Sequence, residues 1–431
     1  MRELFRTQTH HKPELALQYA KGLFQGQKAN IERMCERVTD SQYHQIQHFI
    51  SESPWEWRPA FDSVAKGISD AMADVGKVGL LIDESSHLKK GKKSVGVARQ
   101  YCGTIGKVDN CQVAVYGGLS TQNYYGLIDT ALYLPSEWTE DAGRCDEAGI
   151  PKEFRTYKTK PQLAIDIVKR QKENGVKFDF VGADGLYGNA PHFLRSLDEM
   201  GLLFVVEVHS NERVYEQAPL ISVPEATGIK GRKPSAYKCD GQSAEVRNLL
   251  ETIPETAWEE VVVRQGTKGA LRYMTHVRKV YTWGKGVATS CERLLIIRKT
   301  NTMNGVEIKY AFSNAVEGQY TNTELAQMQS QRYFVERSFQ DAKQEMGMSQ
   351  YQVRGWLAWH HHIALVLLSM EFVLTEKMLF KNEFPLLTSY DIREVFINIY
   401  TRKGATFDEV MDQMKYRHAQ RNADIERNRG H

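Results

Sequence analysis

The middle of the chain is organised by short apolar runs that have the length of β-strands. They are VGLLID (78–83), CQVAVYGGLS (111–120), YGLIDTALYLP (125–135), FDFVGAD (178–184) and LLFVVEV (202–208). Two amphipathic segments that close on a glycine, PQLAIDIVKRQKENG (161–175) and APHFLRSLDEMG (190–201), are typical of helices. Strands that alternate with helices predict a mixed α/β sheet covered on both faces.

The pattern changes on both sides of this region. Residues 1–70 have apolar positions three and four apart, which predicts helices. Residues 209–318 contain alternating segments and are too long for a loop, so we expect a β-rich insertion. Helical patterns resume at 323–346 and 355–380. The predicted domains are an N-terminal helical domain (1–72), a catalytic core in two parts (73–208 and 319–431, the second with the C-terminal helices) and the insertion (209–318).

Composition and charge narrow the possibilities. Charged residues make up 25% of the chain and hydrophobic residues 42%, as in soluble globular proteins. The formal net charge is only +3, so a nucleic-acid binder must gather its positive charge locally. The six cysteines include no C-x-x-C pair, which argues against a zinc site or a disulfide framework. The most apolar run, 363–374, is about half the length that spans a bilayer, and we expect a buried helix and no membrane partner.

Two of the apolar runs end in an aspartate. Asp83 closes the first run and Asp184 closes the fourth, so a sheet with these strands side by side brings both carboxylates to one edge. Carboxylates are the ligands that Mg²⁺ prefers, and two such ions can stabilise the attacking and leaving oxygens of a phosphoryl transfer. For a single strand-end aspartate, capping of the next turn is an equally good interpretation. Glu84 is a rival for Asp83, but on a strand it points to the opposite face. The glycines of ADGLYG (183–188) allow close approach by a ligand or another backbone.

Three stretches together resemble bacterial insertion-sequence transposases of the DDE superfamily. They are LLIDESSHLKKGKKSVGVARQYCGTIGKVDNCQVAV (80–115), ADGLYG, and RYFVERSFQDAKQEMGM (332–348). The resemblance extends from about Lys77 to Trp359 and is closest to the group with a Lys-Lys-Gly segment after the first acid. It implies an RNase H-like core interrupted by the 209–318 insertion, and it carries the catalytic and metal-binding roles to Asp83, Asp184 and Glu336.

Helix geometry supports Glu336 independently of the resemblance. At about 100° per residue, Arg332, Gln340 and Lys343 lie within about 40° of Glu336 on one face. Asp341 and Glu345 lie roughly 140° and 180° away, which makes them poor candidates for the same site. Taken alone, Arg332 and Glu336 would be read as an ordinary i,i+4 ion pair. Arg332, Glu336 and Lys343 match a signature of related transposases, although Gln329 stands where those relatives have tyrosine.

One segment is strongly basic. Residues 85–108 hold six Lys/Arg and no acid, directly after the strand with Asp83. Such a run is usually a solvated loop or hairpin, but its position next to Asp83 favours contact with a DNA backbone. We expect DNA contacts from Lys89, Lys90, Lys92, Lys93, Arg99, Arg332 and Lys343.

The sequence therefore predicts a cut-and-paste DNA transposase. We expect two Mg²⁺ ions, with Mn²⁺ as a substitute, and a homodimer on paired ends of double-stranded DNA, acting on terminal inverted repeats and target DNA. The resemblance implies a bacterial cytosolic protein associated with the nucleoid. Two alternatives stay open: a nuclease or resolvase without strand transfer, and a domesticated DNA-binding protein. The helical residues 1–70 carry nine basic and nine acidic residues, so DNA-end binding and dimerisation are equally consistent with them.

Overall fold

The chain forms two compact units, which are described separately. The computed structural model describes residues 2–5, 12–25, 30–224, 235–266, 269–302 and 305–400, and the single positions 408, 411, 412, 415, 419 and 423. The first unit comprises Met1–Ala60, Ala148–Ile150 and Gln340–His431, and the second comprises Phe61–Glu147 and Pro151–Phe339.

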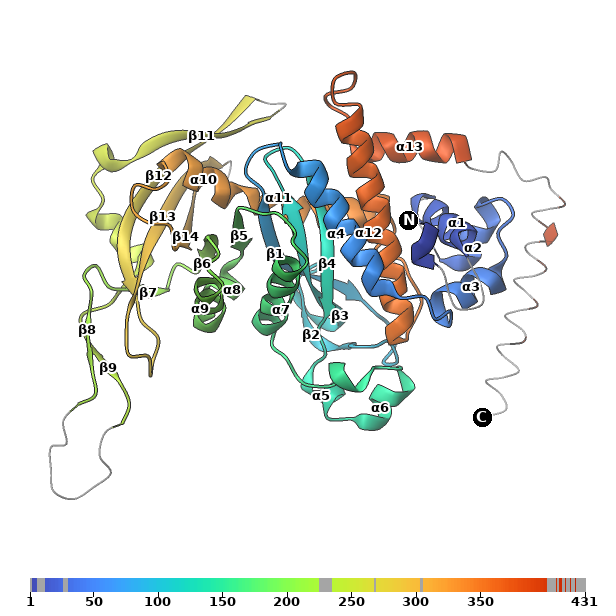
Figure 1. Ribbon diagram of the computed structural model, residues 1–431, viewed down its shortest axis with the longest axis horizontal. Coiled ribbons are helices and arrows are strands. Elements are labelled where there is room, and N and C mark those ends of the chain that lie inside the picture. Colours follow the sequence, from blue (N-terminus) through green and yellow to red (C-terminus); the bar gives the residue numbers. More distant parts are fainter. Residues whose placement is uncertain are drawn as a thin grey trace. The chain divides into compact units, whose positions relative to one another are not determined.

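The second unit is built on a ten-stranded mixed sheet, in the order β11-β12-β13-β14-β6-β5-β1-β3-β2 with β4 beside β3 (Figure 1). The strands are β1 (Gly79–Leu88), β2 (Ala98–Cys102), β3 (Lys107–Ser120), β4 (Tyr125–Leu132), β5 (Phe180–Ala183), β6 (Phe204–Val208), β11 (Glu259–Gly266), β12 (Gly269–Thr282), β13 (Cys291–Thr302) and β14 (Gly305–Ser313). β4, β3 and β1 are antiparallel, and β5 and β6 continue parallel to β1. This is the strand arrangement of an RNase H-like core, so the predicted fold class is confirmed.

Helices cover both faces of this sheet. The helices of this unit are α4 (Trp57–Met72), α5 (Ser136–Thr139), α6 (Ala142–Glu147), α7 (Lys160–Glu173), α8 (Gly185–Gly188), α9 (Pro191–Glu199), α10 (Asn322–Gln331) and α11 (Tyr333–Glu345), with α4 and α11 continuing into the first unit. On β3, Gly117 lies against Ile167 of α7, whereas its neighbour Tyr116 meets Phe339 of α11 at a ring distance of 5.3 Å. Successive strand residues face opposite sides, so α7 and α11 lie on opposite faces.

The helix starts follow from local sequence. Thr159 begins α7 and Thr321 begins α10, each accepting from the backbone N–H three residues on while Gln162 or Glu324 reaches back. These reciprocal capping boxes satisfy N–H groups that a helix start leaves unpaired. The second box fixes the start of α10, and α10 is followed after Arg332 by α11, the helix with Glu336.

The predicted β-rich region continues the core sheet. β14 pairs with β6 in an antiparallel register that sets Ser313 opposite Val205 and Tyr310 opposite Val208. β13, β12 and β11 then follow outward as antiparallel hairpins. The remaining short elements are β7 (Arg213–Val214), β8 (Leu220–Ser222), β9 (Lys238–Asp240), β10 (Ala244–Glu245) and the 3-10 helices η2 (Lys152–Phe154), η3 (Val246–Thr252) and η4 (Glu255–Ala257).

The first unit is helical, as predicted for residues 1–70. It contains η1 (Arg2–Phe5), α1 (Pro13–Phe24), α2 (Ile31–Arg37), α3 (Tyr43–Ser51), α12 (Trp356–Leu379) and α13 (Ser389–Tyr400). Among the described residues, α12 is the one helix long and apolar enough to cross a membrane, but 83% of its most apolar stretch is buried within the protein. The predicted buried helix is therefore confirmed.

Three consecutive histidines on α12 are packing residues. His360, His361 and His362 are all buried. His361 places its two ring nitrogens 2.9 Å from the backbone oxygens of Ile50 and Trp55, and its ring stacks on Trp55 at 3.7 Å. These contacts connect α12 to the N-terminal helices of the same unit.

Candidate functional site

Adjacent parallel strands bring Asp83 and Asp184 to one level. Ile82 on β1 pairs with Ala183 on β5, and Asp83 and Asp184 are the next residues of their chains. One expectation was wrong in detail: Asp83 does not end its strand, because β1 continues to Leu88 and pairs there with β3 along its whole length. Asp83 therefore lies at the point where the parallel partner β5 stops and the antiparallel partner continues. Where β5 stops, the side of β1 that it covered is no longer paired, and this leaves room for a side chain at the end of the parallel strands.

The ADGLYG segment positions Asp184. Its carboxylate accepts from the Leu186 N–H at 3.0 Å and caps the short helix α8, so the capping role and the site position coexist in one residue. The predicted close approach involves another backbone: a Cβ at Gly188 would overlap the carbonyl oxygen of Glu207 on β6. The glycine therefore allows α8, and with it Asp184, to pack directly on the neighbouring strand.

Arg332 joins the two sides of the site. This arginine lies between α10 and α11 and is 15% exposed. Its Nη1 is 3.5 Å from Asp83 Oδ2, and its Nη2 donates to Glu336 Oε1 at 2.7 Å. The i,i+4 ion pair is thus present, but the same guanidinium also reaches the strand acid. The structure therefore links Asp83 and Glu336 through one cation.

The electrostatics show a crowded group of acids. Burial, followed by the charge of Asp184, raises the pKa of Asp83 well above its usual range, and the Arg332 cation only partly opposes this. Burial, followed by the charge of Glu84, likewise raises the pKa of Asp184. A cation close to such carboxylates favours their charged form and so offsets the effects of burial and of the neighbouring acids.

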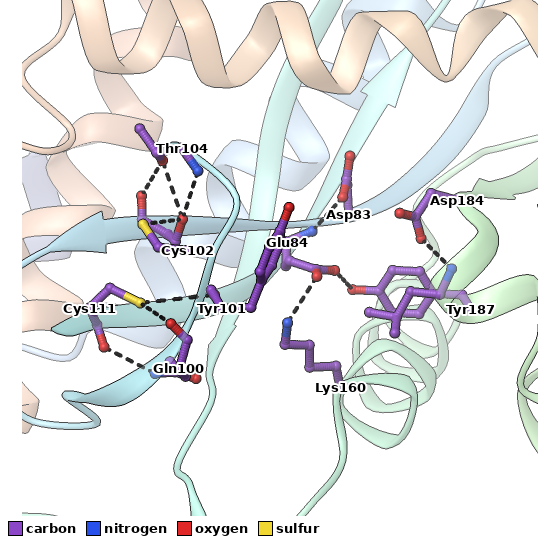
Figure 2. A network of polar contacts seen from close by, with 12 residues as sticks. Asp83, Glu84, Gln100, Tyr101, Cys102, Thr104, Cys111, Lys160, Asp184 and Tyr187 are labelled. Carbon is purple, nitrogen blue, oxygen red and sulfur yellow. Dashed lines mark hydrogen bonds and ion pairs between the residues drawn. The ribbon is translucent and has the colours of Figure 1, made fainter. Parts of the chain in front are cut away.

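Glu84 points away from Asp83, as the sequence predicts. Its two oxygens accept from Lys160 Nζ and from the Tyr187 hydroxyl, each at 2.9 Å. Figure 2 shows the Glu84 carboxylate turned towards these two residues, while Asp83 rises from the other side of β1. Glu84 therefore connects the first residue of α7 to Tyr187 of α8.

A further acid, Glu207 on β6, was missed by the sequence reasoning. Ala183 on β5 pairs with Val206, so Glu207 lies level with Asp184 on the third parallel strand. Its Oε2 is 3.0 Å from Arg332 Nε. A signal was present in the sequence, since LLFVVEV is an apolar run with one acid next to its last residue, a pattern similar to the one that singled out Asp83.

The far face of α11 serves the first unit. Asp341 accepts from Ser389 and lies 3.8 Å from Lys377, and Glu345 pairs with Arg393 at 3.1 Å. Both acids therefore have other partners, as their angular position on the helix predicts. Lys343 lies seven residues after Glu336, in the part of α11 that belongs to the first unit.

The basic segment lies at the other end of β1. Lys89 follows the last residue of β1 and lies six positions after Asp83, or about 20 Å along an extended strand. Burial lowers the pKa of Lys89 to about 8. Lys90 and Lys92 are exposed, Arg99 is exposed on β2, and Lys93 pairs with Glu147 at 3.0 Å. The structure therefore does not place these five cations at the acids, although about 20 Å is also the width of a DNA duplex.

The chemistry of Asp83 and Asp184 suits the binding of a divalent cation. Among the described residues, no group of three or more His, Cys, Asp and Glu is close enough together to hold a metal ion as it stands. However, Asp83 and Asp184 supply the hard oxygen ligands that such ions prefer, and their raised pKa values reflect negative charge that a cation would neutralise. Arg332 already occupies the space between Asp83 and Glu336, which shows that this space accepts positive charge.

Comparison with known proteins identifies the family. The family described as DDE superfamily endonuclease matches residues 1–270, a range that includes Asp83 and Asp184 but ends before Glu336. A probable transposase for insertion sequence element IS701 from Microchaete diplosiphon is 28% identical over 311 residues, which cover 72% of this chain and 68% of that protein.

Two solved structures are more distant. A piggyBac transposase synaptic complex with hairpin DNA has a TM-score of 0.39 and 11% identity, covering 93% of this chain and 74% of its own. The NurA nuclease from Sulfolobus solfataricus has a TM-score of 0.25 and 9% identity, covering 77% and 94%.

Members of the matched family depend on divalent metal ions for their reaction, which agrees with the chemistry of the acids described above. The prediction of a DDE transposase, an enzyme that acts on DNA, is confirmed by the match and the relative. The chain belongs to the DDE superfamily endonucleases.

Proposed function

We propose that this endonuclease carries out cut-and-paste transposition of an insertion sequence, with Asp83, Asp184 and Glu336 as its catalytic acids. The observation that carries the proposal is the register of β1 and β5, which sets Asp83 beside Asp184, together with the Arg332 bridge to Glu336. Acids from three distant parts of the chain meet in one region, as a phosphoryl-transfer centre requires.

The proposed reaction of the transferred strand at each element end has two steps. A water oxygen attacks the phosphorus at an element end and the P–O3′ bond breaks, leaving a 3′-hydroxyl on the element and a 5′-phosphate on the flank. That 3′-hydroxyl oxygen then attacks a phosphorus in target DNA, forms a new phosphodiester and releases a target 3′-hydroxyl. Asp83 and Asp184 would hold divalent ions from the sheet, and Glu336 would do so from α11. Two Mg²⁺ ions, or Mn²⁺ in their place, supply charge stabilisation to the attacking and leaving oxygens when bound.

DNA binding is assigned to the cations named from the sequence. Lys89, Lys90, Lys92, Lys93 and Arg99 would contact the backbone away from the acids, and Arg332 and Lys343 would contact it along α11. Two copies of the chain would bridge the two inverted ends in the bacterial cytosol, at the nucleoid.

Cleavage assays on the cognate ends test the acids. Asp83→Asn, Asp184→Asn and Glu336→Gln should each abolish Mg²⁺-dependent cleavage and leave end binding largely intact, because each removes a charged ligand with little change in volume. Asp109→Asn is a matched control, since Asp109 also accepts from the N–H of the residue after it, at 2.7 Å, as Asp83 does at 2.8 Å. Near wild-type cleavage by any of the three variants would show that the acid in question is wrongly assigned.

A joining assay separates transposition from simple cleavage. Element ends cut in advance to expose the 3′-hydroxyl should become joined to a target plasmid. Cleavage without joining would favour the nuclease or resolvase alternative, and absence of both under Mg²⁺ or Mn²⁺ would favour a DNA-binding protein that has lost catalysis.

A further inference from the structure

Glu207 has contacts that give it a distinct role in the site. We propose that Glu207 is a positioning residue of the nuclease centre, which holds Arg332 between Asp83 and Glu336 and connects this arginine to the β-rich insertion. The inference rests on the proposed function of those two acids. Its experiment is therefore chosen so that the two ideas can fail separately.

The two carboxylate oxygens of Glu207 face different partners. Oε2 lies 3.0 Å from Arg332 Nε. Oε1 lies 3.4 Å from Arg298 Nη2 and 4.0 Å from Lys309 Nζ. Arg298 on β13 and Lys309 on β14 are direct cross-strand partners, so both cations come from one place in the insertion. Glu207 therefore joins the insertion to the arginine of the site.

The same contacts argue against a role as a metal ligand. Glu207 is level with Asp184, and its side chain is 13% exposed, so its position alone would suit a fourth ligand. However, three cations already share its oxygens, whereas Asp83 meets only one cation among the ion pairs of the described residues. The carboxylate is thus directed at the arginine and not at the space between the acids.

Fixing one nitrogen of Arg332 directs the other two. The guanidinium is a rigid planar fork, so an Nε held by Glu207 sets the directions of Nη1 and Nη2. These two donors face Asp83 at 3.5 Å and Glu336 at 2.7 Å. When the acids are neutralised by divalent ions, the same donors are available to the oxygens of the phosphate. Without Glu207, the charge of Arg332 would be balanced by Asp83 and Glu336 alone. The guanidinium would then compete more strongly with a divalent ion for these two carboxylates.

Binding of Mn²⁺ to the full-length protein without DNA, measured by titration calorimetry, tests this role. Arg332→Gln removes the competing cation and should tighten binding, whereas Glu207→Gln should weaken it about tenfold. In the Arg332→Gln background, Glu207→Gln should change the affinity by less than about threefold, because only its distant charge is then removed. Both single variants should lower kcat for cleavage, and Glu207→Gln should do so with little change in the Kd for end DNA. Glu260→Gln is the matched control, since Glu260 forms an exposed ion pair with Arg272 at 2.8 Å on the same sheet.

The outcomes distinguish the two ideas. Equal effects of Glu207→Gln in both backgrounds, or no effect in either, would overturn the positioning role. Mn²⁺ binding that Asp83→Asn does not change would instead overturn the assignment of the acids. If Glu207→Gln does not fold, as judged by circular dichroism, Arg298→Gln takes its place. That variant loosens Glu207 from the insertion and should shift Mn²⁺ affinity in the same direction and by less, and an unchanged affinity would count against the proposal. Glu207→Asp keeps the charge and should recover part of the affinity.

Discussion

The crowding of acids around Asp83 leads to a prediction about stability that is independent of cleavage. Among the ion pairs of the described residues, Arg332 is the one cation at Asp83 and Glu336, and it is shared with Glu207. The charge of Asp184 adds to the crowding around Asp83. Asp83→Asn removes one of these charges and keeps an oxygen that can accept from the Glu84 N–H. We expect the variant to be more stable than the wild type in EDTA by about 1 kcal/mol, a typical gain when an active-site charge is removed. For a unit this large, that corresponds to a melting temperature about 2 °C higher.

Added Mg²⁺ should reverse the order. An ion present at ten times its dissociation constant stabilises the folded protein by about 1.4 kcal/mol, or about 3 °C. The wild type should gain this increment, and Asp83→Asn should gain little of it because it lacks one ligand. Thermal unfolding of both proteins and of the control Asp109→Asn, in EDTA and in Mg²⁺, measures the effect. If Asp83→Asn melts below the wild type in EDTA, or if Mg²⁺ raises both proteins equally, the reasoning about this centre is refuted.

Three further predictions concern other parts of the chain. Replacing Lys89, Lys90, Lys92 and Lys93 together with alanine should reduce the slope of log affinity against log salt concentration by about 0.9 for each phosphate that is no longer neutralised. An unchanged slope would show that the segment is a solvated loop that does not contact DNA. Burial raises the pKa of Glu371 to about 7, so this carboxyl favours the folded state below its ordinary value of 4.5 and loses that contribution as the pH rises through 7. Glu371→Gln should therefore stabilise the protein to urea at pH 8 by about 1–2 kcal/mol after allowance for solvent screening, with no gain at pH 4, and equal gains at both pH values would contradict it. The complex on paired ends should contain at least two copies of the chain by light scattering, and one copy per end without bridging, while strand transfer proceeds, would exclude the dimer.

The fold was predictable where the residues themselves repeat at the period of a strand or a helix. The run at 111–120 became part of β3, and the run at 202–208 contains β6. The threonines that begin α7 and α10 are visible in the sequence as capping boxes. β2 was not predicted, because its residues Arg99, Gln100 and Tyr101 carry no apolar alternation, and the pairing with β3 alone makes them a strand. The extension of β1 past Asp83 has the same cause, since the polar residues after Asp83 also pair with β3.

In the candidate site, too, some residues could be predicted from the sequence and others could not. The acids could be named because an acid at the end of an apolar run, or on one face of a helix, has a local signal. The roles of their neighbours depend on pairings between distant strands: Glu207 and Arg332 are 125 positions apart, and only the order β1-β5-β6 makes them neighbours. For the same reason, the sequence could not show that Lys93 pairs with Glu147.

The pairing of β14 with β6 has a consequence for the ancestry and engineering of this enzyme. The chain leaves the core after Val208 and returns at Tyr310, and these two residues lie directly opposite each other in an antiparallel pair. The chain therefore leaves and rejoins the core sheet at the same place. A tight hairpin could have connected β6 and β14 before the intervening hundred residues were acquired. An ancestral core of this kind would have kept its strand order unchanged. The same junction is a natural splice point for exchanging the whole segment between related enzymes, with α10 and then the helix that carries Glu336 following downstream.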